Sequence, residues 1–254
     1  MSFDVAAESY DRFMGRYSVK LSPGLADLAG VVAGQKVIDV GCGPGALTAE
    51  LVRRVGADSV AAVDPSEPFV AATRDRHPGV DVRVAPAEEL PYEDDTFDAA
   101  LAQLVVHFMR DPVAGIREMA RVTRPGGVVA ASVWDLAGGR APLSPFWKAA
   151  SELRADVVDE SGFSGAREGH LRELFEAAGL EDVEESTLTS TSAVATFEEW
   201  WEPYTLGVGP AGAYAQKLDE AELVSLRERC RAQLPDPPFT VTTYAWAARG
   251  HVAG

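Results

Sequence analysis

Residues 39–45, which read Asp-Val-Gly-Cys-Gly-Pro-Gly, place alternating glycines between an apolar run and a helical pattern. The run from Lys36 to Val40 is rich in β-branched residues and predicts a buried strand. From Ala46 onward, apolar residues recur at helical spacing until Gly56. Glycines permit a sharp turn and a close approach of the backbone to a ligand, and the new helix offers free N–H groups and the positive end of its dipole. The segment therefore predicts a cradle for a polar or anionic ligand group.

An acidic residue follows the next predicted strand. Val60 to Val63 is apolar and ends at Asp64, about twenty residues beyond the glycines, where a carboxylate can accept hydrogen bonds from both hydroxyls of a ribose. A dinucleotide and a different nucleoside cofactor both fit this arrangement, and a glycine turn can also serve sterics alone. The dinucleotide fingerprint asks for a third glycine where this chain has Ala46, but its looser form accepts alanine. Asp39, the acid before the first glycine, discriminates better between the two cofactors.

Further motifs follow in the order found in one enzyme superfamily. After the loop at 39–45 and Asp64 come Ala87-Glu88-Glu89-Leu90-Pro91, Asp95-Thr96-Phe97-Asp98 and Arg121-Val122-Thr123-Arg124-Pro125-Gly126-Gly127. Together they resemble the class I S-adenosylmethionine (SAM)-dependent methyltransferases, in the small-molecule branch that includes the ubiquinone and menaquinone biosynthesis methyltransferases. The resemblance covers residues 5–135 strongly and the remainder in outline. It is specific for the cofactor and leaves the acceptor open.

The resemblance implies a Rossmann-like α/β fold. Its seven-stranded sheet is mostly parallel with an antiparallel last strand, and helices lie on both faces and form a cover over the acceptor. We expect a single domain over residues 1–254, with a cofactor-binding core at about 5–135 and substrate-cover insertions at about 136–169 and 197–235. Periodicity predicts one or two helices over residues 5–28, punctuated at Ser22-Pro23-Gly24, and later strands at 80–84, 96–102, 128–134, 183–194 and 239–247.

The same resemblance assigns cofactor contacts. Asp64 is expected to hold the ribose, Gln103 the methionine amino group and Arg16 the methionine carboxylate. The family's usual aspartate at the adenine amino group is replaced here by Pro86, whose side chain accepts no hydrogen bond, so the adenine falls to the next two residues or to apolar contact. The full predicted set is Arg16, Asp39, Gly41, Cys42, Gly43, Gly45, Asp64, Pro65, Ala87, Glu88 and Gln103.

His107 is the residue we predict as a general base. It follows the fourth predicted strand near the carboxyl edge of the sheet, where open α/β folds bind ligands, and an imidazole there can take a proton from an acceptor oxygen or nitrogen. Packing against Phe108 is the alternative. The aromatic residues predicted to line the acceptor pocket, each of which is also a common core residue type, are Tyr10, Tyr17, Trp134, Trp200 and Trp201. They favour a small, partly apolar acceptor such as a natural product or a quinone-like ring.

Composition and charge argue against other partners. A net charge of −16 repels phosphate backbones and no lysine–arginine cluster is visible, so we predict a small-molecule partner and no nucleic acid. The two cysteines, Cys42 and Cys230, give neither a disulfide framework nor metal-ligand spacing, so no metal is predicted. No apolar run approaches membrane-spanning length, and Met1 to Val5 lacks the pattern of a signal peptide, so we expect a cytoplasmic protein without membrane association.

The sequence thus predicts transfer of a methyl group from SAM to an oxygen, nitrogen or carbon of a small molecule, with S-adenosylhomocysteine (SAH) as product. Such a displacement depends on holding donor and acceptor in line in a site that excludes water, so it does not demand a catalytic base. Two alternatives stay open. One is a SAM-binding module that transfers no methyl group, and the other is a nicotinamide-dependent oxidoreductase, which shares the glycine turn but leaves the later motifs unexplained.

Overall fold

The computed structural model describes residues 7–254. The predictions that concern residues 1–6, namely the start of the domain and its first helix and the lack of a signal peptide, lie outside the described residues. The described strands form one sheet in the order β3-β2-β1-β4-β5-β7-β6. Their bounds are β1 Val37–Val40, β2 Val60–Asp64, β3 Asp81–Val84, β4 Phe97–Gln103, β5 Thr123–Trp134, β6 Glu181–Val194 and β7 Phe239–His251.

The direction of the strands matches the predicted sheet. β1, β2, β3, β4 and β5 pair in parallel, whereas β7 runs antiparallel to both of its neighbours, β5 and β6. The parallel strands bring their carboxyl ends to one edge of the sheet, where ligands bind in open α/β folds. The predicted Rossmann-like class with an antiparallel last strand is therefore confirmed.

Successive apolar side chains on each strand point to opposite faces of the sheet, so both faces are apolar and helices cover both of them. On β1, Val37 packs in a cluster with Leu25 and Leu47, whereas Ile38 packs with Ile116 on the opposite face. The first face carries α2 (Arg16–Leu28), α3 (Ala46–Val55) and α4 (Glu67–Arg76), and the second carries α5 (Pro112–Val122) and α7 (His170–Ala178). The remaining helical turns of this core are α1 (Ala7–Tyr10), η1 (Asp11–Gly15), η2 (Ala57–Ser59) and η3 (Val106–Phe108).

The predicted break at Ser22-Pro23-Gly24 is wrong, because α2 continues through Pro23. A proline inside a helix removes one backbone hydrogen bond and crowds the preceding turn. Leu21 and Leu25, one on each side of the proline, are 1% and 0% exposed. Burial of these side chains outweighs the local cost of the proline, so tertiary packing decides the course of the helix.

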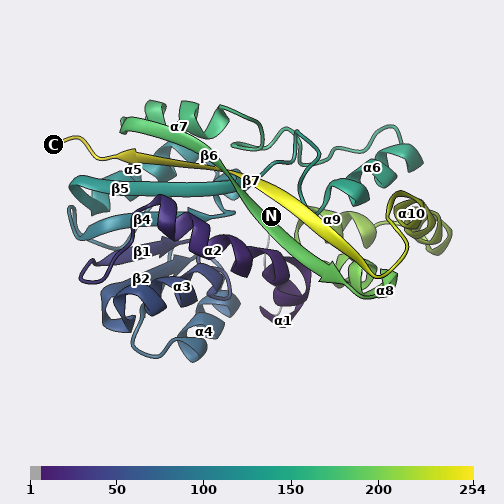
Figure 1. Cartoon of the computed structure of the whole chain (residues 1–254), viewed down its shortest axis with the longest axis horizontal. Coiled ribbons are helices and arrows are strands. Elements are labelled where there is room, and N and C mark those ends of the chain that lie inside the picture. The colour runs from purple at the N-terminus through teal and green to yellow at the C-terminus, as the bar shows by residue number, and fades with distance from the viewer. Residues whose placement is uncertain (1–6) are drawn as a thin grey trace.

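A second group of helices packs at the far end of the long strands. Figure 1 shows β6 and β7 running together beyond the parallel strands toward α8 and α10. This cover consists of α6 (Ser144–Leu153), α8 (Phe197–Trp201), η4 (Glu202–Leu206), α9 (Gly209–Ala215) and α10 (Glu220–Gln233). The core of this cover is aromatic. The rings of Phe146 and Tyr204 are stacked with their centroids 4.8 Å apart, and the ring centroids of Trp200 and Tyr204 are 4.7 Å apart. That these helices cover an acceptor stays a prediction.

Candidate active site

A cavity lies at the carboxyl ends of β1, β2 and β4, where the glycine loop leads into α3. It contains about 730 Å³ of space not occupied by atoms, including space open to solvent. We call it the strand-end cavity. It is lined by Tyr10, Asp11, Ser18, Asp39, Gly41, Cys42, Gly43, Pro44, Ala46, Leu47, Asp64, Pro65, Phe69, Gln103, Leu104, Val105 and Phe108.

The glycine loop is shaped by close packing as well as by its turn. Gly41 has a φ of 73°, and a Cβ built on it would lie 2.4 Å from Cγ2 of Val105, so no larger residue fits without displacing the segment after β4. The N–H of Gly43 donates a hydrogen bond of 2.9 Å to Oδ2 of Asp64. The loop and the end of β2 are thus joined directly, which confirms that the two predicted motifs meet in space.

Asp64 lines the strand-end cavity with a carboxylate that is 7% exposed. Its other oxygen, Oδ1, accepts a hydrogen bond of 2.8 Å from the N–H of Ser66. Burial raises the pKa of Asp64, while the hydrogen bonds from Ser66 and Gly43 act in the opposite direction. Each carboxylate oxygen can accept a second hydrogen bond, so the group is positioned and still able to receive a ligand hydroxyl.

Two buried oxygens that line the same cavity lack hydrogen-bond partners within the described part of the chain. Oδ2 of Asp39 accepts a 2.6 Å bond from Oγ1 of Thr48, but Oδ1 has no partner, and burial raises the pKa of this carboxyl to about 7. Nε2 of Gln103 donates a 3.1 Å bond to the Ser18 carbonyl, which leaves Oε1 without a partner. Unsatisfied buried acceptors cost free energy, so both oxygens favour a ligand that donates hydrogen bonds, as an ammonium group does.

A second cavity adjoins the first under the helical cover. It contains about 450 Å³ of space not occupied by atoms, including space open to solvent, and it shares Tyr10, Leu104 and Phe108 with the strand-end cavity. We call it the cover cavity. Its lining is Tyr10, Phe13, Met14, Leu104, His107, Phe108, Trp134, Leu136, Leu143, Glu160, Val208, Gly209, Pro210 and Ala211. Because the two cavities have side chains in common, ligands bound in them would face each other across these residues.

His107 lies in the cover cavity, on η3 directly after β4. Its ring packs against that of Phe108 with the two centroids 3.9 Å apart. Its buried Nδ1 has no hydrogen-bond partner among residues 7–254. Burial lowers the pKa of His107 to about 3, so the imidazole is neutral at pH 7. The ring of His107 therefore packs against Phe108 and also carries a nitrogen that can accept a proton, so the two interpretations are compatible.

Tyr10 and Trp134, which the sequence predicts for the acceptor pocket, both line the cover cavity. Tyr10 also reaches the strand-end cavity, where its ring packs edge-on against Phe69 with centroids 5.4 Å apart. Burial, with Asp64 and Asp11 nearby, raises the pKa of Tyr10, so its hydroxyl keeps its proton. The structure thus places Tyr10 between the two cavities.

Tyr17, Trp200 and Trp201 do not line either cavity. Tyr17 is 3% exposed and packs edge-on against the far side of Trp134, with ring centroids 6.4 Å apart. Trp200 and Trp201 lie in the aromatic core of the cover against Tyr204. They support the cavity from behind, and contact with an acceptor remains a prediction for all three.

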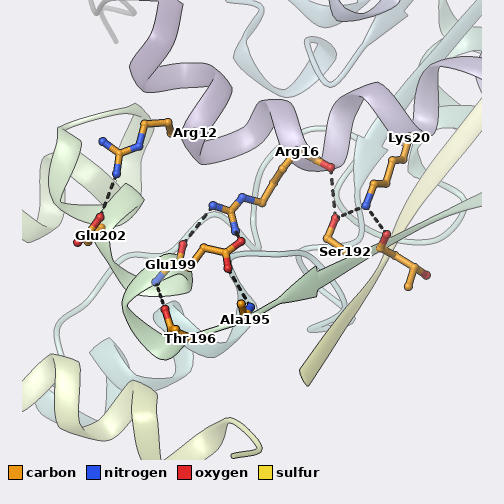
Figure 2. A network of polar contacts seen from close by, with 9 residues as sticks. Arg12, Arg16, Lys20, Ser192, Ala195, Thr196, Glu199 and Glu202 are labelled. Carbon is orange, nitrogen blue, oxygen red and sulfur yellow. Dashed lines mark hydrogen bonds and ion pairs between the residues drawn. The ribbon is translucent and has the colours of Figure 1, made fainter. Parts of the chain in front are cut away.

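The structure does not bring Arg16 to the strand-end cavity. Its guanidinium pairs with Oε1 of Glu199 at 3.4 Å and donates a 3.1 Å bond to the Glu199 carbonyl. Figure 2 shows that Arg12 and Lys20, on the same helical segment, reach in the same way toward Glu202 and Ser192. These contacts join the N-terminal helices to β6 and to the start of the cover.

The residues predicted around the adenine also lie outside both linings. Ala87 is 7% exposed and packs in the core, and Oε1 of Glu88 accepts the N–H of Arg110 at 2.7 Å. Among the other predicted cofactor residues, Gly45 begins α3 beside the cavity without lining it. The glycine loop, Asp39, Asp64, Pro65 and Gln103 are brought together, and the adenine end is the part that the structure leaves without its predicted contacts.

Glu160 is the residue of the cover cavity that sequence reasoning missed. It belongs to the segment between α6 and α7 and is 2% exposed. In the sequence it follows Asp159 in a polar stretch with serine and glycine, a pattern that predicts a solvated loop. The apolar residues Phe13, Met14, Leu136, Leu143 and Val208 were missed for a similar reason, because no periodicity links segments so far apart.

Comparison with known proteins identifies the family. A profile described as a methyltransferase domain matches residues 38–131. The chain is 34% identical over 191 residues to the 27-O-demethylrifamycin SV methyltransferase of Amycolatopsis mediterranei. The matched region covers 71% of this chain and 69% of that protein. It is 36% identical over 133 residues to the ubiquinone/menaquinone biosynthesis C-methyltransferase of Idiomarina loihiensis, half of each chain. The protein belongs to the class I SAM-dependent methyltransferases.

A solved structure shows the shared fold. Phosphoethanolamine N-methyltransferase 2 of Haemonchus contortus, in complex with phosphomonomethylethanolamine and SAH, matches with a TM-score of 0.60 at 17% identity, over 97% of this chain and 56% of that one. The chain spans about half the length of several curated relatives that it matches, 49% and 50% in two cases. Within residues 7–254 no helix is both long and apolar enough to cross a membrane, and no group of three His, Cys, Asp or Glu side chains is placed to hold a metal ion.

Proposed function

We propose that the protein transfers the methyl group of SAM to a small, largely apolar acceptor bound in the cover cavity. The observation that carries this proposal is the adjoining pair of cavities. One lies at the strand ends and includes Asp39, Asp64 and Gln103, the other is mainly apolar and lies under the cover, and Tyr10, Leu104 and Phe108 belong to both. A methyl transfer needs a donor and an acceptor held in line at near contact, which this arrangement permits.

The strand-end cavity fits SAM through its orphaned oxygens. Oδ1 of Asp39 and Oε1 of Gln103 would receive hydrogen bonds from the methionine ammonium group, and the Asp64 carboxylate would receive the ribose hydroxyls. SAM, when bound, supplies an electrophilic methyl group on its sulfonium. Glycines 41 and 43 and Pro65 would then lie along the cofactor, while the adenine would depend on apolar contact and backbone groups, since position 86 is proline.

The cover cavity offers His107 to the acceptor. A neutral imidazole with an unpartnered Nδ1 can take the proton that an acceptor hydroxyl or amine loses as the new bond to carbon forms. The apolar lining excludes water from the reacting atoms. The name of the Amycolatopsis relative specifies a small organic acceptor for that protein, and this supports a small molecule here.

Two further features of the chain bear on its setting. A net charge of −16 disfavours nucleic acid as an acceptor. Cys42 and Cys230 are both buried and free, as is usual for a protein of a reducing compartment, and we place the protein in the cytoplasm.

Calorimetry tests the cofactor assignment. We expect SAM and SAH to bind to the purified protein with micromolar dissociation constants, and NAD, the control, not to bind. Binding of NAD in preference to SAM would favour the oxidoreductase alternative. A panel of apolar phenols, amines and carbon acids, assayed for SAH production, then tests transfer; binding of SAM without turnover on any member would support a SAM-binding module.

A further inference from the structure

We propose that Glu160 determines which acceptors bind in the cover cavity. Its carboxyl would receive a hydrogen bond from a hydroxyl or ammonium group on an otherwise apolar acceptor. This inference rests on the proposed function, because it assumes that the cover cavity is the acceptor site. It adds a chemical class to the acceptor: an apolar body with a hydrogen-bond donor placed away from the atom that is methylated.

The burial of Glu160 calls for a partner. The residue is 2% exposed and lines the cover cavity. Its Oε2 accepts a hydrogen bond of 2.8 Å from Nε1 of Trp147, a buried residue of α6 that holds the carboxyl in place. No ion pair to Glu160 is found among residues 7–254. A buried carboxyl without a cation is costly, and one neutral donor satisfies only part of its hydrogen-bonding capacity.

Within residues 7–254, the ionisable groups around Glu160 provide no compensating charge. Asp159 precedes it in the chain, the Tyr204 hydroxyl donates to the Pro142 carbonyl at 3.0 Å, and His107 shares the cavity as a neutral ring. Burial, with Asp159 nearby, raises the pKa of Glu160 to about 7 against the lowering effect of the Trp147 bond. A hydrogen-bond donor on the acceptor would therefore be the first strong partner of Oε1, the oxygen of Glu160 that Trp147 does not hydrogen-bond.

Glu160 and His107 serve different parts of the acceptor. Both side chains line the cover cavity alone, but His107 directly precedes Phe108, which belongs to both cavities, whereas Glu160 comes from the segment between α6 and α7. No hydrogen bond joins the two side chains, and the lowered pKa of His107 has burial as its cause. The methylated atom would lie near His107, and Glu160 would fix the acceptor's orientation through a second contact.

Three probes of one shape test the proposal: naphthalene, 1-naphthol and 1-naphthylmethylammonium. Their binding to the full-length protein, followed by naphthyl fluorescence, requires neither SAM nor turnover. We expect at least one of the two donor-bearing probes to bind about ten-fold or more tightly than naphthalene. Equal binding of all three, or binding of none, would overturn the proposal. Calorimetry of SAH on the same protein reports the cofactor site separately, so a failure there is distinguishable.

Variants of Glu160 connect the preference to its carboxyl. Glu160→Leu should remove the preference and leave naphthalene binding intact. Glu160→Gln keeps the acceptor for Trp147 and the shape, so it should retain 1-naphthol within a few-fold and lose the ammonium probe about ten-fold or more. Glu176→Gln, a change of an exposed glutamate of α7 outside the cavity lining, should match the wild type. A preference that persists in both Glu160 variants would show that the carboxyl does not bind the donor.

Discussion

The two cavities are built in different ways. Most of the strand-end cavity comes from segments that directly follow parallel strands, so the sheet itself sets their positions. The cover cavity draws on the N-terminal helices, on the segments after β4 and β5, on the loop with Glu160 and on the start of α9. The first is held by hydrogen bonds to loop N–H groups and the second by aromatic and aliphatic packing. Acceptor preference can therefore change through the cover while the cofactor site stays intact.

Replacing His107 tests the chemistry of the cover cavity and has the largest expected effect. His107→Ala and His107→Phe should each lower turnover by about 10²-fold or more, measured as SAH production with an acceptor found in the panel, because neither side chain accepts a proton. SAH affinity should stay within about two-fold. The phenylalanine variant restores packing against Phe108, so activity regained in it but not in the alanine variant would assign His107 to packing.

The pH dependence of stability tests the buried carboxyl of the strand-end cavity. Because burial raises the pKa of Asp39 to about 7, the folded protein keeps a proton that the unfolded chain releases near a pH of about 4. Stability of the ligand-free protein should therefore decrease between these values, and Asp39→Asn should remove about 2–4 kcal/mol of that decrease. Urea unfolding at several pH values measures it. Asp58→Asn, at an exposed site, should leave the slope unchanged, and an unaltered slope in Asp39→Asn would contradict the assignment.

Asp64 tests the ribose contact. Asp64→Ala should weaken SAM binding by about 1.5–3 kcal/mol, because the variant loses a charged hydrogen-bonding partner and the loop bonds from Gly43 and Ser66. Calorimetry measures the change, and Asp81→Ala, an exposed carboxylate of β3, provides the control. SAM affinity equal to that of the wild type in Asp64→Ala would exclude the ribose assignment.

Replacing Arg16 tests whether this residue belongs to the strand-end cavity, and this change has the smallest expected effect. Arg16→Ala should change SAM affinity by less than about two-fold and stability by about 1 kcal/mol at most, because the side chain pairs with Glu199 in a partly exposed contact. A double-mutant cycle with Glu199→Ala measures the pairing. A ten-fold loss of SAM affinity would instead support the methionine-carboxylate role that the family resemblance implies.

The sequence predicted the elements and the strand-end cavity well, because the signals there are local. Short apolar runs located β1 and β2, and the glycines and Asp64 lie where a strand ends, so each motif is predicted together with its place in the sheet. A local signal also begins α5, where the Asp111 carboxylate accepts the N–H of Ala114 at 3.0 Å.

The cover cavity was predicted less well, because its lining is set by tertiary packing. Arg16 and Tyr17 lie next to each other beside residues that do line a cavity, and the way α2 packs on the cover decides where each points. Glu160 has the composition of a loop residue and is buried only because Trp147 and the cover enclose it. The continuation of α2 through Pro23 has the same origin, since local propensity gave way to burial.

The N-terminal helical segment contributes residues to both cavities. Tyr10 and Asp11 line the strand-end cavity, and Phe13 and Met14 a few residues later line the cover cavity. Arg12 and Arg16, on the opposite side of this stretch, hold it to Glu202 and Glu199 of the cover. A displacement of this stretch would therefore open both cavities together.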